Sequence, residues 1–102
     1  MAYMKVATLE EIAPGTARQV VVNGRKIGLF NRNGKIFALD DTCPHRGANL
    51  SEGECDETSV FCPWHGAAFD LATGAVQSPP AQTGVASLAV QIVGNEIQLD
   101  LV

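Results

Sequence analysis

The sequence predicts a small all-β domain, either a sandwich or a small barrel, and three features lead to this prediction. Short β-like runs recur along the 102 residues. Asn-Gly, Thr-Gly or Gly-Asn pairs separate many of these runs and favour tight turns between antiparallel strands. A central stretch rich in Cys, Pro, Gly and His interrupts the pattern, which indicates a loop-built site carried by a β framework.

The first forty residues predict four strands. Residues 4–7 open the chain as a strand, and Thr8-Leu9-Glu10-Glu11 matches a capping box, so we expect one helical turn that Pro14-Gly15 ends. Two hairpins follow, with turns at Asn23-Gly24 and Asn33-Gly34. Their strands are expected at residues 19–22, 26–31 and 35–39.

The rest of the chain predicts shorter elements and then one long strand. Residues 60–61 and 68–69 are short β runs, and Thr73-Gly74 is a turn. Residues 85–93 predict a single strand, and residues 96–101 return after a turn at Gly94-Asn95. We therefore expect one domain, residues 1–102, in which a loop-rich subdomain at about 41–83 is inserted between strand regions 1–40 and 84–102.

The charges are divided unequally along the chain. All seven Lys and Arg residues lie within residues 1–46, whereas residues 47–102 contain seven acids and no base. A dipolar molecule of this kind can orient a charged partner, although solvated turns are an equally good explanation. The bases are scattered near turns, which argues against nucleic-acid binding.

The chain start and the hydropathy predict a cytoplasmic protein without a membrane segment. Met1-Ala2-Tyr3-Met4-Lys5 lacks an apolar run of signal-peptide length, and no stretch approaches the length of a membrane span. Three cysteines are an odd number and argue against a disulfide framework.

Two paired motifs carry the chemistry: Cys43-Pro44-His45-Arg46-Gly47 and Cys62-Pro63-Trp64-His65-Gly66. They contain both histidines and two of the three cysteines, a donor set that predicts a metal site. Structural zinc with two Cys and two His is one interpretation, but zinc fingers usually pair Cys with Cys and His with His. One Cys and one His from each loop suit a two-iron cluster, in which one iron takes both thiolates and the other both imidazoles.

These motifs make the chain resemble the Rieske family, whose pattern is C-x-H, a spacer and C-x-x-H followed by Gly. Sixteen residues separate His45 from Cys62, and the resemblance covers nearly the whole chain. It implies a Rieske-like sandwich of antiparallel strands and one [2Fe–2S] cluster. It also implies that Cys43 and Cys62 bind one iron while His45 and His65 bind the other.

The neighbours of these ligands have expected roles of their own. Gly47 and Gly66 allow backbone N–H groups to approach the cluster sulfurs, although both also fit ordinary turns. Trp64 either shields the cluster or packs against prolines. Pro80 belongs to a Ser-Pro-Pro segment that resembles the proline loop covering the cluster in this family. Arg46 is the only base near the expected cluster.

Departures from the family pattern narrow the class of Rieske protein. Respiratory members carry an extra cysteine in each cluster loop, and this chain has none there. Cys55 lies in the spacer and is expected to be a bystander thiol. High-potential members also place hydroxyl residues where this chain has Ala67 and Phe69. We therefore expect a low-potential carrier, near the lower end of the Rieske range at about −150 mV.

The resemblance implies an electron carrier rather than an enzyme, because the chain is too short to hold a second iron site and a substrate pocket. Its expected partners are an NADH-dependent flavoprotein ferredoxin reductase and the terminal Rieske oxygenase of an aromatic ring-hydroxylating dioxygenase system, active in aromatic hydrocarbon catabolism. The alternative is the small subunit of an assimilatory nitrite reductase. Glu52, Glu54, Asp56 and Glu57 are expected to form an acidic rim for basic partner residues, or merely to solubilise a long loop.

Overall fold

The computed structural model confirms the all-β prediction and describes residues 3–42, 49–63, 67–77 and 84–100. Its strands are β1 (Tyr3–Thr8), β2 (Ala17–Val22), β3 (Arg25–Arg32), β4 (Lys35–Asp40), β5 (Ser59–Phe61), β6 (Ala68–Asp70), β7 (Ser87–Leu88), β8 (Val90–Val93) and β9 (Glu96–Asp100). Two 3₁₀ turns, η1 (Leu9–Glu11) and η2 (Leu50–Glu52), are the only helical elements among the described residues. No described helix is long and apolar enough to cross a membrane.

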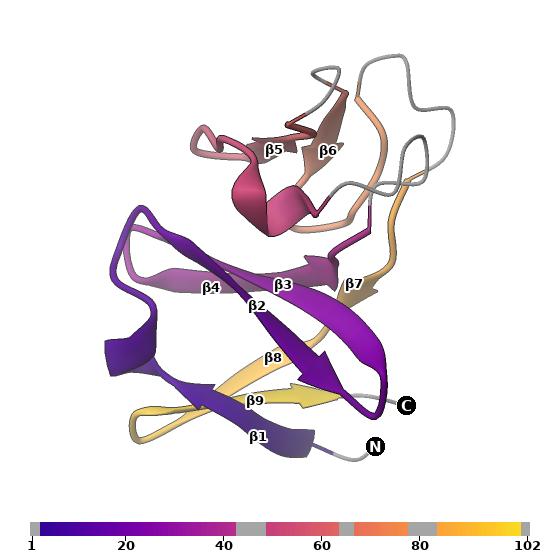
Figure 1. Ribbon diagram of the computed structural model, residues 1–102. Helices are drawn as coiled ribbons and strands as arrows, with labels where there is room; N and C mark the ends of the chain where they lie inside the picture. Colours follow the sequence, from indigo (N-terminus) through magenta and orange to yellow (C-terminus); the bar gives the residue numbers. More distant parts are fainter. Residues whose placement is uncertain (1–2, 43–48, 64–66, 78–83, 101–102) are drawn as a thin grey trace.

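The strands form three antiparallel sheets that lie in layers (Figure 1). The central sheet has the order β2-β3-β4-β7, and the sheet below it has the order β1-β9-β8. The β5–β6 hairpin lies above the central sheet. This two-stranded unit and η2 are built entirely from the middle of the chain.

The β3–β4 hairpin is the centre of the fold because both of its faces are buried. Side chains alternate across a strand, so Ile27 and Leu29 face the three-stranded sheet, where they pack with Ile97 and Leu99. Phe30 and Leu39 belong instead to a second core with the β5–β6 hairpin and η2. One hairpin thus separates the lower sheet from the region that carries the ligand motifs.

The predicted turns at the two Asn-Gly pairs are confirmed. Asn23 and Gly24 have φ values of 51° and 80°, and Asn33 and Gly34 have values of 57° and 90°. Positive φ at both central residues is the requirement of the type I′ hairpin turn, which Asn and Gly meet at least cost. These turns fix the β2–β3 and β3–β4 registers.

The helical turn after β1 is also confirmed, as a single 3₁₀ turn. The backbone N–H of Thr8 donates to Glu11 Oε1 at 2.9 Å, as a capping box requires. This contact and the Thr8 hydroxyl lower the pKa of Glu11 below its ordinary value, and Arg18 and Lys5 add to the effect.

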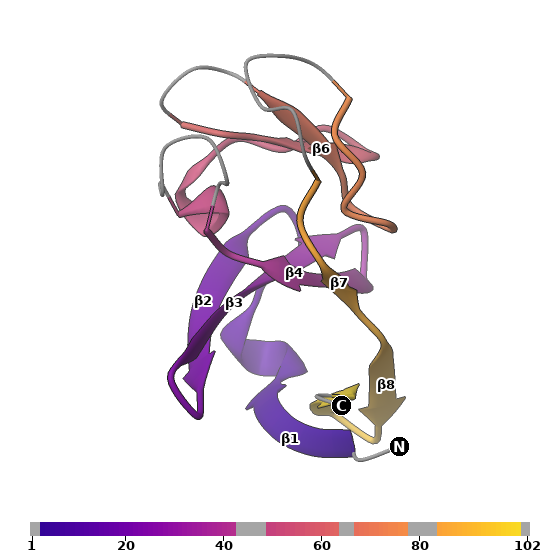
Figure 2. The same ribbon diagram turned by 90° about the vertical axis from the view of Figure 1, so that its right-hand side faces the viewer.

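The prediction of one strand over residues 85–93 is wrong. The chain forms β7 against β4, with Leu88 opposite Ala38, and then β8 against β9, with Val90 opposite Leu99. The two strands belong to different sheets (Figure 2), and Ala89 is the residue between them. A continuous apolar run fits a strand that changes sheets as well as it fits one straight strand.

Candidate metal centre

The second motif begins at Cys62, directly after β5. The backbone N–H of Cys62 donates to the carbonyl oxygen of Ala67 at 2.7 Å, so the β5–β6 hairpin closes across residues 63–66. Cys62 is 3% exposed, and its thiol is free. A buried free thiol at the mouth of a closed loop fits the role of a thiolate ligand.

The first motif lies in residues 43–48, whose two ends are held together. Thr42 and Asn49 form an isolated antiparallel bridge. Beside it, the backbone N–H of Leu50 donates to the carbonyl oxygen of Asp41 at 2.7 Å. The described residues on either side of 43–48, which we call the first ligand segment, therefore lie side by side. The same holds for Cys62 and Ala67, on either side of residues 63–66, the second ligand segment.

The described residues near both ends of the predicted proline segment, residues 78–83, are also hydrogen-bonded. The Gln77 N–H donates to the carbonyl oxygen of Ala68 at 2.7 Å, and the Val85 N–H donates to that of Gly74 at 2.8 Å. Gly74 has a φ of +77°, and a Cβ there would collide with the carbonyl oxygen of Val85. Only glycine allows this close approach of the two backbones.

Residues at the ends of all three segments share one apolar core. Leu50 follows the first ligand segment, Cys62 and Ala67 stand on either side of the second, and Val76 and Val85 lie near the ends of the proline segment. We call these five residues the shared floor. Because they pack in one core, the described residues next to the three segments lie together in the fold.

The structure describes three of the predicted site residues, namely Cys62, Ala67 and Phe69. Ala67 and Phe69 are both fully buried, and neither supplies a hydroxyl. The other predicted site residues lie outside the described residues, and these are Cys43, His45, Arg46, Gly47, Trp64, His65, Gly66 and Pro80. Within the described parts of the chain, no three Cys, Asp or Glu side chains come together as an alternative metal site.

Just before the first motif, the structure shows a buried carboxylate that the sequence analysis does not single out. Asp41 is fully buried and accepts hydrogen bonds from two other segments of the chain. The sequence signal for Asp41 is that it is the second of two carboxylates directly after the apolar run 36–39. That pattern is equally typical of an exposed turn, so sequence alone does not distinguish the two.

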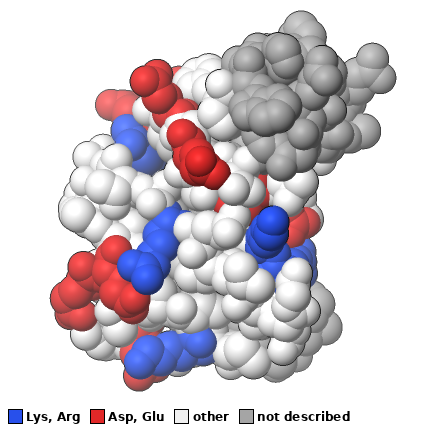
Figure 3. All heavy atoms as spheres, viewed as in Figure 1, with Lys and Arg blue, Asp and Glu red and all other residues white. Residues whose placement is uncertain are grey.

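The acidic segment, Glu52, Glu54, Asp56 and Glu57, is exposed but not uniform. Asp56 accepts hydrogen bonds from the N–H groups of Thr58 and Ser59, at 2.9 and 2.7 Å, and these contacts lower its pKa. Glu52 accepts one from Asn49 Nδ2 at 2.6 Å. In the view of Figure 1, acidic side chains gather on the upper part of the surface (Figure 3).

A groove passes between this acidic segment and the second motif. Glu52 and Glu54 line one side, and Phe61, Cys62 and Pro63 line the other. Gly53 packs so closely on β5 that a Cβ there would collide with the carbonyl oxygen of Phe61. The backbone that carries Glu52 and Glu54 is therefore held against β5, and both residues line the same groove as Cys62.

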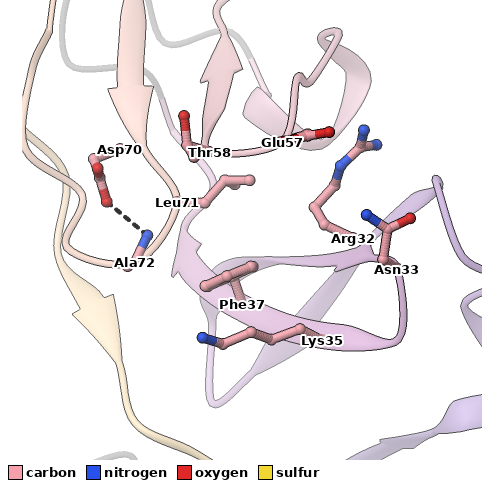
Figure 4. A pocket seen from close by; sticks show the side chains of 9 residues that line it. All are labelled: Arg32, Asn33, Lys35, Phe37, Glu57, Thr58, Asp70, Leu71 and Ala72. Carbon is pink, nitrogen blue, oxygen red and sulfur yellow. Dashed lines mark hydrogen bonds between the residues drawn. The ribbon is translucent and has the colours of Figure 1, made fainter.

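A second pocket lies at the turn between β3 and β4 (Figure 4). Phe37 and Leu71 line it, and Lys35 Nζ lies 5.2 Å from the centre of the Phe37 ring. The Arg32 guanidinium and the Lys35 amine point away from each other. Because its cationic groups diverge, this pocket does not present a common site for one anion, and we assign it no ligand.

Cys55 lies in the spacer and bridges Val60 through the backbone. Burial raises the pKa of its thiol. The positive charge of Arg32 lowers this pKa in part, and the negative charge of Asp56 raises it further. A raised pKa leaves less thiolate at neutral pH, which is the nucleophilic form. The expectation that Cys55 is a bystander remains a prediction.

We predict that the Cys55 thiol reacts slowly with iodoacetamide at pH 7 and that its reaction rises with pH later than that of free cysteine. The physical reason is the raised pKa, since the thiolate appears only as pH approaches that value. Mass spectrometry of the alkylated, cluster-loaded protein measures the rate, with glutathione as the control. Alkylation at pH 7 as fast as that of glutathione would contradict the prediction.

Known proteins resemble this chain both in sequence and in fold. The biphenyl dioxygenase ferredoxin subunit of Pseudomonas sp. (strain KKS102) is 35% identical over 101 residues, which cover 98% of this chain and 93% of that protein. A solved complex of reduced oxygenase and oxidized ferredoxin in carbazole 1,9a-dioxygenase contains a chain that matches with a TM-score of 0.88 and 32% identity, covering 95% of this chain and 91% of that one.

A crystal structure of the putative NADH-dependent nitrite reductase small subunit from Mycobacterium tuberculosis matches with a TM-score of 0.88, over 99% of this chain and 96% of that one. At 22% identity it shows the fold alone. Residues 2–89, which are most of the chain, match the sequence pattern of the family described as "Rieske [2Fe-2S] domain". The protein therefore belongs to the Rieske [2Fe–2S] domain family.

Proposed function

We propose that this chain is a one-electron carrier of an aromatic ring-hydroxylating dioxygenase system. It receives electrons from an NADH-dependent flavoprotein reductase and passes them to a terminal oxygenase. The observation that carries the proposal is the match to a dioxygenase ferredoxin subunit along nearly the full length of both chains. We place the carrier in the cytoplasm, where NADH is available to the reductase.

The proposed ligands are Cys43, His45, Cys62 and His65, which hold one [2Fe–2S] cluster. The one ligand that the structure describes, Cys62, is buried and free, and both ligand segments are closed at their ends. When bound, the cluster gains and loses one electron, and two neutral imidazoles make it less negative than a four-thiolate cluster.

The framework contributes rigidity to this function. The shared floor and the backbone contacts at Thr42, Cys62 and Gly74 connect the residues that flank the segments to the framework. Ligands held in this way need little rearrangement when the charge of the metal site changes. We assign the chain no catalytic residue, because its reaction is the transfer of an electron to another protein.

We predict a midpoint potential on the order of −150 mV, at the low end of the Rieske range. Ala67→Ser combined with Phe69→Tyr should raise it, because new hydroxyls that donate to cluster sulfurs stabilise the added electron. A hydrogen bond of about 1 kcal/mol corresponds to about 40 mV for one electron. Protein-film voltammetry measures both values.

Phe37→Tyr is the matched control for this variant. Phe37 packs at the edge of the same core but lies on β4, away from the second motif. Its hydroxyl should leave the potential unchanged. A wild-type midpoint well above zero, or a double variant with the wild-type potential, would contradict the assignment.

The acidic segment is the proposed contact for basic residues of a partner. Glu54 is the best candidate, because it lines the groove beside Cys62 and Pro63. Asp56 is less suitable for a test, since it holds the N–H groups of Thr58 and Ser59. Glu57 lines the other pocket with Arg32 and so provides a control of equal charge in the same segment.

We predict that Glu54→Lys slows reduction by the reductase about tenfold at low salt and weakens the dependence of the rate on ionic strength. Glu57→Lys should have a smaller effect. Stopped-flow absorbance of the cluster measures the rate from low to high salt. Equal rates for Glu54→Lys and wild type at low salt would show that the acids serve solubility alone.

Electron delivery to an oxygenase tests the function itself. The reduced chain is mixed without oxygen with the oxidised terminal component of the biphenyl dioxygenase system, and the transferred electrons are counted by absorbance. We expect one electron for each loaded chain, and none from Cys62→Ser, which lacks a proposed ligand. A loaded chain that reduces a sirohaem nitrite reductase but not the oxygenase would favour the alternative function.

A further inference from the structure

A fully buried carboxylate lies where β4 ends and the first ligand segment is about to begin. Asp41 is 0% exposed and stands two residues before Cys43. No salt bridge joins it to any cationic side chain among residues that the structure describes. A buried carboxyl group needs hydrogen-bond donors to offset the loss of its hydration, so its partners indicate what it does.

Three donors converge on the two oxygens of Asp41. The Ser51 backbone N–H donates to Oδ1 at 2.6 Å, and the Ser51 hydroxyl donates to Oδ2 at 2.6 Å. Gln19 Nε2, from β2, also donates to Oδ2 at 2.7 Å. The carboxylate thus links the end of β4 to β2 and to η2, which follows the first ligand segment.

The main chain of Asp41 strengthens the same connection. Its carbonyl oxygen accepts from the Leu50 N–H at 2.7 Å, and its N–H donates to the Lys26 carbonyl oxygen at 3.1 Å. Both the side chain and the backbone of one residue therefore hold the far end of the ligand segment. The next residue, Thr42, completes the closure by its bridge to Asn49.

The central sheet leaves space for this carboxylate at Gly28. Gly28 lies opposite Gln19 in the β2–β3 pairing, and both of its neighbours in β3 are fully buried. A Cβ at Gly28 would stand 2.6 Å from Asp41 Oδ1 and 3.0 Å from the Phe30 ring. A glycine inside a strand weakens it, so its presence in this central strand fits a site built around Asp41.

We propose that Asp41 is a positioning residue for the iron–sulfur cluster. By joining the two ends of the first ligand segment, it sets where Cys43 and His45 meet the metal, without itself touching the cluster. The inference rests on the proposed role of these two residues as ligands. Mutation of groups that orient metal ligands typically lowers metal affinity about 10–100-fold.

Two substitutions of Asp41 distinguish a role in positioning the segment from a role of its negative charge. Asp41→Ala leaves three donors without an acceptor. Asp41→Asn removes the negative charge but keeps one acceptor for the Ser51 N–H. Rotation of the Gln19 amide and the Ser51 hydroxyl then satisfies the new amide group. A positioning role predicts that only the alanine variant is strongly affected.

The experiment compares cluster-loaded wild type, Asp41→Ala and Asp41→Asn. Iron transfer to a chromogenic chelator gives the rate of cluster loss, and EPR of the reduced proteins reports the geometry of the iron ligands. We expect Asp41→Ala to lose iron about tenfold faster and to show altered g-values. Asp41→Asn should keep the wild-type g-values and lose iron at close to the wild-type rate.

Ile97→Ala is the control for general loss of stability. Ile97 is fully buried in the other core, so its truncation lowers the unfolding temperature without touching Asp41. It should keep the wild-type g-values. If Asp41→Ala does not accumulate as folded protein, Ser51→Ala replaces it, and a smaller change in the same direction is expected because one donor is lost.

Three results would overturn the proposal. The first is an alanine variant, or Ser51→Ala in its place, with wild-type g-values and wild-type iron loss. The second is an equal change in Asp41→Ala and Asp41→Asn, which would indicate charge rather than position. The third is equally altered g-values in Ile97→Ala. Wild-type protein that binds no [2Fe–2S] cluster would instead overturn the proposed function.

Discussion

The packing of the shared floor is the constraint on which the site depends. Three of the four proposed ligands come from two segments of six and four residues, which are too short to bury a core of their own, and Cys62 stands directly before the second segment. Leu50, Cys62 and Ala67 bring the ends of these segments into one core with Phe69, and Leu50 and Phe69 are fully buried. Burial of each large side chain contributes about 1.5–3 kcal/mol, so this core stabilises the residues that flank the two segments.

The doubly buried β3–β4 hairpin makes that core possible. Its residues alternate between the two cores, so the lower sheet stabilises the hairpin and the hairpin in turn supports the ligand region. Asp41 extends β4 directly into the first ligand segment and connects it to β2 and η2. Two kinds of contact therefore connect the framework to the ligand region. One is the apolar packing of the shared floor, and the other is the set of buried hydrogen bonds to Asp41.

Sequence reasoning predicts the local features of this chain well and the long-range ones poorly. The turns at Asn23-Gly24 and Asn33-Gly34 were predictable because few residue pairs tolerate positive φ at both positions. The donor set of the metal site remains a prediction from the spacing of Cys and His, since of its four residues the structure describes Cys62 alone. The change of sheet at Ala89 was not predictable, since the partners of β7 and β8 lie far away in the sequence. The burial of Asp41 was equally hidden, because it depends on Gly28, Gln19 and Ser51 together.

⁵⁷Fe Mössbauer spectroscopy of the oxidised protein tests the central claim most directly. With two thiolates on one iron and two imidazoles on the other, the two irons have different surroundings. The account predicts two distinct iron sites of equal intensity, with the added electron localised on one of them after reduction. Two equivalent irons, or a protein that binds zinc in place of iron, would contradict it.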